Sequence, residues 1–175
     1  PGRFDIRRGG VALNTPLSVP AQGVDARLRL DELDVDAWRA VFEGGAQGAN
    51  SANSGALTAL DVKLGRLRAF GYDFSPFELQ AEATASGWNG QLESEQVAGG
   101  FAWNGEDDGQ VALRLERLRL GERKTSDAQL ARLLETDEHF ALPGMDIVAS
   151  GFELYGRRLG RLSLQARNEG GLWWL

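Results

Sequence analysis

The side chains best suited to catalysis or metal binding are few in this sequence of 175 residues. His139 is the one histidine, and it lies in a polar, charged segment where a solvated histidine is the ordinary finding. The sequence has no cysteine, which excludes a disulfide framework and a thiolate metal site. It also has no phosphate-binding loop, nucleophile elbow or cluster of histidines. We therefore expect no enzymatic activity, no metal and no cofactor.

Two groups of carboxylates lie close together in the sequence, Asp34 with Asp36 and Glu106 with Asp107 and Asp108. Such groups can bind calcium or act as acid and base. The alternating acidic pattern of a calcium loop, with its distant glutamate, is absent from the sequence. We interpret Asp34 as the cap of a short helix and the second group as a polar turn.

Trp88 and Trp173 lie in segments that we predict to be turns, where an indole can stack on a sugar ring. Aromatic side chains near strand ends also serve as ordinary packing residues. These tryptophans give one alternative for the function, a β-sandwich module that binds a glycan or a protein partner.

The elements that carry these side chains are predicted to be strands. Residues 23–35 alternate, with Val24, Ala26, Leu28 and Leu30 on one side and charged residues on the other. A period of two is typical of a sheet with one apolar and one solvated face. The alternation then slips by one residue, as it does in three later strands, and a slip needs a bulge or bend to keep the apolar side chains on one face. We predict these irregularities at Asp31–Glu32, Gly65–Arg66, Glu116–Arg117 and Ser150–Gly151.

The sequence repeats itself at an offset of 85 residues. Residues 60–81 match residues 145–166 without a gap, and Trp88 matches Trp173 at the same offset. Each copy reads as two alternating strands around a glycine-centred turn, which predicts a β-hairpin. A fixed offset is typical of repeat architectures. We expect a single β-rich segment over 1–175 with two repeats, at about 5–90 and 91–175.

The fold class that follows is mostly β and antiparallel, with a curved or twisted sheet that forms either an open groove or a sandwich-like closed structure. Edge strands are expected within 3–19, and further strands within 86–94 and 97–104. Two short helices are expected, over 34–45 and over roughly 126–135. No strand–helix–strand rhythm is present, so a doubly wound parallel sheet is not expected.

The composition of the sequence argues against some classes of function. The 23 glycines suit many turns and strand ends. The net charge of −6 argues against a nucleic-acid partner, because no basic excess is available to displace counterions. No run of about 18 apolar residues occurs, as a membrane-spanning helix would require. Because the sequence starts at Pro1 without a methionine, we expect it to be a segment of a longer protein.

One face of the predicted sheet is a candidate binding surface. It offers only apolar side chains, so it suits acyl chains, and each methylene that it buries contributes about 0.8 kcal/mol. In a closed sandwich the same side chains would cover one another. The candidates, which would make non-directional contacts and take no part in catalysis, are Leu60, Val62, Phe77, Leu79, Leu113, Leu115, Met145, Ile147, Leu162 and Leu164.

Residues 142–166 resemble a recurring segment of the YhdP proteins, in the AsmA-like superfamily. The matching features are Leu142–Pro143, the Gly156–Arg157 turn, and Leu159–Gly160–Arg161–Leu162 before the second strand. Residues 28–42 resemble the strand of that family that leads into an Asp-Ala-Trp helix, here Asp36–Ala37–Trp38. The first copy departs from the pattern, since Ser75–Pro76–Phe77 stands where Gly-Arg-Leu is expected.

This resemblance implies a bridge-like lipid transfer protein of the bacterial envelope. Such proteins are large, anchored in the inner membrane and extended through the periplasm, and they are implicated in moving phospholipid toward the outer membrane. The chain would then be one periplasmic segment of a path for phospholipid acyl chains, and its partners would be phospholipid and the rest of the parent chain.

Three alternatives stay open on the sequence. The chain can be a segment of the lipid path, a binding module for a glycan or protein partner, or a structural spacer. An exposed apolar face is also an aggregation hazard, so a dimer of the excised segment across this face is one expected outcome.

Overall fold

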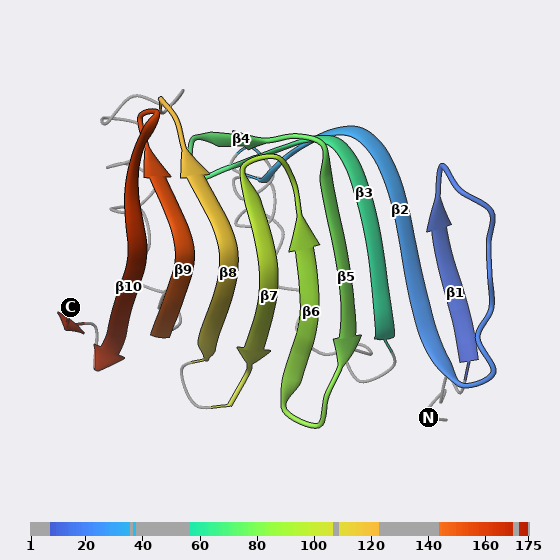
Figure 1. Cartoon of the computed structure of the whole chain (residues 1–175). Helices are drawn as coiled ribbons and strands as arrows, with labels where there is room; N and C mark the ends of the chain where they lie inside the picture. Colours follow the sequence, from blue (N-terminus) through green and yellow to red (C-terminus); the bar gives the residue numbers. More distant parts are fainter. Residues whose placement is uncertain are drawn as a thin grey trace.

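The computed structural model describes residues 8–35, 37, 57–106, 109–122, 144–169 and 172–174, and these residues form eleven strands of one sheet (Figure 1). The strands are β1 (Arg8–Leu13), β2 (Gly23–Asp34), β3 (Leu57–Ala69), β4 (Tyr72–Phe74), β5 (Phe77–Ala83), β6 (Gly87–Glu93), β7 (Val97–Asn104), β8 (Gln110–Leu120), β9 (Gly144–Leu154), β10 (Arg157–Glu169) and β11 (Leu172–Trp174).

The strands lie side by side in the order β1-β2-β3-β5-β6-β7-β8-β9-β10-β11, and β4 pairs with β3 outside this path. Most neighbours are antiparallel, which confirms the predicted class. The pairs β1/β2, β2/β3 and β8/β9 are parallel, so the sheet is mixed. The described strands form one open sheet, and the sandwich-like alternative is therefore wrong for them.

Two glycine-centred hairpins were predicted, and the structure confirms both. In the β3–β4 turn, Phe70 and Gly71 have φ of 55° and 78°. In the β9–β10 turn, Tyr155 and Gly156 have φ of 51° and 73°. Two successive residues with positive φ are typical of the two-residue type I′ loop, whose twist matches that of the flanking strands.

The four predicted slips take two structural forms. Between β7 and β8 the register shifts, because Ala98 faces Arg117 while Gly99 faces Leu115, so Glu116 is the extra residue of a bulge. Strands β2 and β3 keep one register across their slips, since Leu30 faces Leu64 and Leu33 faces Leu67. Their irregularity is a shared bend and not a bulge.

In β9 the slip at Ser150–Gly151 also leaves the register with β8 unchanged. The register shifts instead on the other side of β9, around Gly160 of β10.

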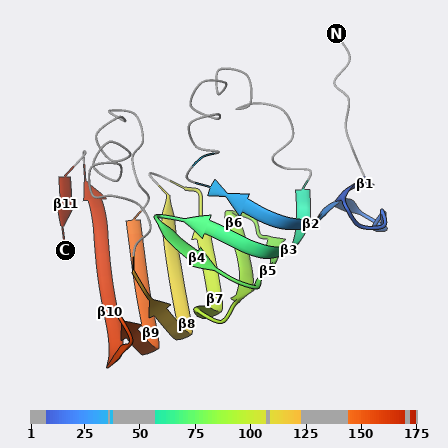
Figure 2. The ribbon, with the colours of Figure 1, turned by 90° about the horizontal axis from the view of Figure 1, so that it is seen from above.

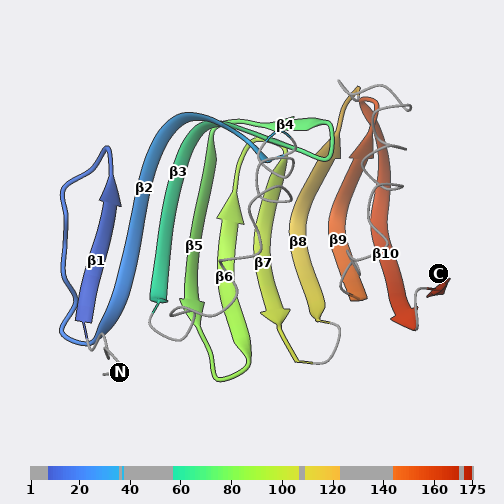
Figure 3. The same cartoon turned by 180° about the vertical axis from the view of Figure 1, so that it is seen from behind.

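Figures 1 and 3 show the ribbons of β2 and β3 arching over at their ends, and Figure 2 shows these ends and β4 reaching across toward β8. Leu30 precedes the bend and Leu33 and Leu67 follow it, yet all three pack against one core cluster. The bend therefore returns the apolar side chains to the same side of the sheet after each slip.

Both predicted helices fall almost wholly outside the described residues. At the start of the first one, the backbone N–H of Ala37 donates a 2.9 Å hydrogen bond to Oδ1 of Asp34. This is the capping contact that the sequence predicted for Asp34.

An arginine–aspartate contact, which we call the clasp, joins the two strands of a parallel pair. In β2/β3, Nη2 of Arg29 lies 2.8 Å from Oδ2 of Asp61, and Nη1 donates to the carbonyl oxygens of Leu28 and Asp61. In β8/β9, Arg114 makes the same three bonds to Asp146 and to the carbonyl oxygens of Leu113 and Asp146. No hairpin sets the register of a parallel pair, so these directional bonds fix it.

Loss of the clasp should destabilise the fold. We expect Arg29→Ala to lower the free energy of unfolding by about 1–2 kcal/mol, because it removes charge-assisted bonds that are partly shielded from water. Arg27→Ala is the matched control, since Arg27 lies two residues away and its side chain makes no hydrogen bond or ion pair with another described residue, and its effect should stay within about 0.5 kcal/mol. Urea unfolding measures both values. Equal losses in the two variants would show that the clasp adds nothing to stability.

The bend itself depends on Gly65. A Cβ atom at this position would lie 2.6 Å from the carbonyl oxygen of Asp31, which is closer than backbone packing permits. We expect Gly65→Ala to lower the free energy of unfolding by about 1–3 kcal/mol. A Cβ at Gly144 would meet its nearest atom at 3.6 Å, so Gly144→Ala is the control and should be close to neutral. Thermal unfolding of the two variants tests whether the bend requires close contact between the strands.

Candidate functional site

Strand pairing brings all ten predicted apolar residues to one side of the sheet, which we call the apolar face. Leu113 lies opposite Ile147, and Ile147 lies opposite Leu164, so three strands contribute to one row. In the other half of the sheet, Val62 lies opposite Leu79. The remaining members occupy alternate positions of the same strands and therefore share the face: Leu60, Phe77, Leu115, Met145 and Leu162.

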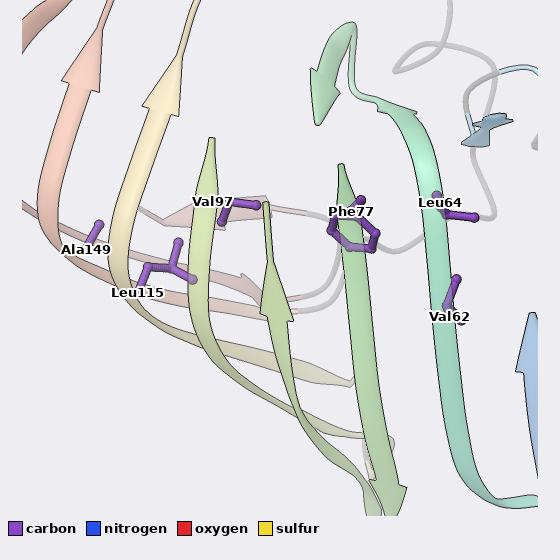
Figure 4. Close-up of a cluster of buried hydrophobic side chains, with 6 residues drawn as sticks. All are labelled: Val62, Leu64, Phe77, Val97, Leu115 and Ala149. Atoms are coloured by element: carbon purple, nitrogen blue, oxygen red, sulfur yellow. The ribbon is translucent and has the colours of Figure 1, made fainter. Parts of the chain in front are cut away.

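The ten residues differ in their access to solvent. Val62, Phe77 and Leu115 are 9%, 8% and 3% exposed, and they form the core cluster with Leu64, Val97 and Ala149 (Figure 4). These side chains already pack against neighbours near the bend. The other seven are half-buried and keep surface available for a ligand: Leu60, Leu79, Leu113, Met145, Ile147, Leu162 and Leu164.

The site prediction left out residues of β6 and β7, the two strands that lie between β5 and β8. In β6 and β7, Trp88 pairs with Trp103, and Gly90 pairs with Phe101, on the apolar face. Trp88 belongs to strand β6 and Trp173 to strand β11, so the prediction that they lie in turns is wrong. The alternation of Phe101 and Trp103 was visible in the sequence. The position of Trp88 opposite Trp103 was not, because it depends on the register of the β6–β7 hairpin, and this hairpin lies outside the matching segments 60–81 and 145–166.

The opposite face is polar and rich in ion pairs. Besides the two clasps it carries a 2.7 Å ion pair between Lys63 and Glu78. The hydrogen bond to Asp146 raises the pKa of the Arg114 guanidinium, which favours its charged form. A hollow of about 740 Å³ lies on this face, and its polar lining includes Asp25, Arg27, Gln80, Glu82 and Gln91.

The candidate chemical groups of the sequence have structural roles where they are described. Asp34 accepts the capping bond from Ala37 and lies 3.2 Å from Arg68. The hydrogen bond to Asp73 raises the pKa of Arg68, with a smaller contribution from Asp34. Within the described ranges, no group of three or more acidic, histidine or cysteine side chains is placed to hold a metal ion. The following predicted residues lie outside the described residues: Asp36, Asp107, Asp108 and His139.

These features define the class of protein, which is an open two-faced β-sheet. A single open sheet with one polar and one apolar face is suited to contact with an apolar ligand or an apolar partner surface.

The family follows from comparison of sequences. The model of the YhdP protein family matches residues 1–175, and the chain belongs to this family. Neither the curated proteins nor the solved structures include one that matches the chain. In the part of the chain that the structure describes, no helix is both long and apolar enough to cross a membrane.

The two zones of the apolar face should respond differently to a polar side chain. We expect Leu115→Ser to lower the free energy of unfolding by about 3–5 kcal/mol, because Leu115 is buried in the core cluster. Leu164→Ser should cost only about 1 kcal/mol, since Leu164 is half-buried on β10 near the end of the sheet. Urea unfolding measures both. Similar losses would mean that the half-buried zone is also part of the packed core.

Proposed function

We propose that the chain is a segment of a lipid path in the bacterial periplasm, in which the apolar face holds or conducts phospholipid acyl chains between the inner and outer membranes. The observation that carries this proposal is the row of half-buried apolar side chains across one open sheet. Membership of the YhdP family supports it, since the family implies lipid handling in the cell envelope. The role is non-enzymatic, and the parent protein is anchored in the inner membrane.

The chemistry of the face fits an acyl chain better than a small polar ligand. Leucine and isoleucine side chains offer no hydrogen bond, and methionine offers only a weak thioether acceptor, so this face does little to orient hydroxyl or amide groups. Each methylene transferred from water contributes about 0.8 kcal/mol, whatever its position along the face. A chain can therefore move from one strand to the next while it keeps most of its binding free energy, which is what conduction requires.

Lipid binding can be tested on the 175-residue chain. Native mass spectrometry, followed by organic extraction, should detect phospholipid bound to the purified protein and taken up from dioleoylphosphatidylethanolamine vesicles. We expect the double substitution Leu79→Ser and Leu164→Ser to weaken uptake about tenfold or more, because it removes apolar contacts from both halves of the face.

The matched control is the double substitution Gln80→Ser and Gln165→Ser, which changes the next residue of each strand on the polar face. This variant should bind lipid like the unchanged chain, and circular dichroism should show that both variants are folded. Equal uptake by the two variants would contradict the proposal. A lipid-free monomer that takes up none would favour a binding module or spacer, and a lipid-free dimer would indicate that a second copy covers the face.

A further inference from the structure

Trp88 and Trp103 form an aromatic pair at one end of the apolar face. They face each other on the rung next to the last one of the β6–β7 ladder, whose last rung is Gly87 with Asn104. Trp88 is half-buried, whereas Trp103 is 41% exposed. The pair therefore lies where the apolar face meets water, at the end of β7 opposite to Val97 of the core cluster.

The chain segments beyond the pair, at this end of the ladder, are polar. The N–H of Gly105 donates a 2.8 Å hydrogen bond to the carbonyl oxygen of Ser86, and the N–H of Glu106 donates to Oδ1 of Asn104. Ser86 and Glu106 are both exposed. An indole has a large apolar surface and one N–H donor, so it is favoured where one side is apolar and the other is wet. Tryptophan is enriched at head-group level in membranes for the same reason.

The strands beyond the pair have the length and the surface that an acyl chain needs. Trp103 lies six positions after Val97 in β7, which corresponds to about 20 Å of strand. One leaflet of a bilayer has a hydrocarbon thickness of about 15 Å, half of the whole core. Gly90 and Gly99 add no side chain to this part of the face, while Phe101 and Leu92 add apolar ones.

We infer that Trp88 and Trp103 contact the polar end of a bound phospholipid, whose acyl chains run along β6 and β7 toward Val97. This inference rests on the proposed function and adds an orientation to it. The indole rings cover the glycerol end of the chains, and the indole N–H groups donate to ester or phosphate oxygens. The head group stays in water beside Ser86 and Glu106.

Fluorescence quenching by nitroxide-labelled phosphatidylcholine tests the orientation. In a variant with Trp38, Trp173 and Trp174 replaced by phenylalanine, the pair is the emitter. We expect a nitroxide on the choline to quench this emission more strongly than a nitroxide near the end of an acyl chain. A second variant carries Phe77→Trp near the bend and phenylalanine at all five natural tryptophans, and it should show the reverse order.

The possible outcomes distinguish a failure of the proposed orientation from a failure of the proposed function. Stronger or equal quenching of the pair by the chain-end label would overturn the orientation, while showing that lipid binds. Bound lipid in native mass spectra without quenching of the pair by either label would also overturn it. If neither label quenches either reporter and the spectra contain no lipid, the proposed function fails together with the orientation.

Substitution of the pair gives an independent test. The double variant Trp88→Ala and Trp103→Ala should bind dioleoylphosphatidylethanolamine about tenfold more weakly, because two partly buried indoles are lost. Trp88→Phe with Trp103→Phe keeps most of the apolar surface and should recover most of this loss. An alanine variant that is folded by circular dichroism and binds with unchanged affinity would contradict the inference.

Discussion

A strand of more than ten residues keeps one apolar face only if each break in its alternation is matched by its neighbours. In this sheet, the slips of β2 and β3 lie side by side, and those of β8 and β9 do the same. The strands of each pair therefore change direction together and keep their ladder. A slip without this shared bend would have moved the later leucines to the polar face. The close approach of Gly65 to the backbone of Asp31 shows how tightly the paired bends fit.

The same arrangement recurs in the second half of the sheet, which supports the proposal of an 85-residue repeat. The registers of β2/β3 and β8/β9 coincide after a shift of 85 residues, as do those of β5/β6 and β10/β11. The clasp recurs with the same atoms. Beyond the bend, Asp34 pairs with Arg68, whereas Arg119 pairs with Glu153, so the charges are reversed. Opposite charges across the parallel pair are retained, although the strand that carries each sign is not.

Much of the fold follows from local patterns in the sequence. Alternation places the ten apolar candidates on one face, and the glycine positions locate both type I′ turns, because each depends only on neighbouring residues. The parallel pairing of β2 with β3 cannot be predicted from local patterns, because the sequence of the connecting residues 35–56 does not specify which strand edge the next strand joins. The difference in burial between Leu113 and Leu115 does not follow either, because both occupy equivalent positions of one strand. It arises from the arch of distant strands over one end of the face, where Leu67 and Phe74 join the core cluster.

The two zones of the apolar face differ in what they can contact. Near the bend, side chains such as Leu64 and Leu115 are buried and hold the sheet together. Farther from the bend, Leu60, Met145 and Leu164 stay half-exposed, so a ligand can bind there without displacing the core. Apolar contacts alone set neither the direction nor the depth of a bound chain. A polar boundary is needed for both, and in our proposal the tryptophan pair beside an exposed hairpin turn supplies one at the end of the face opposite the bend.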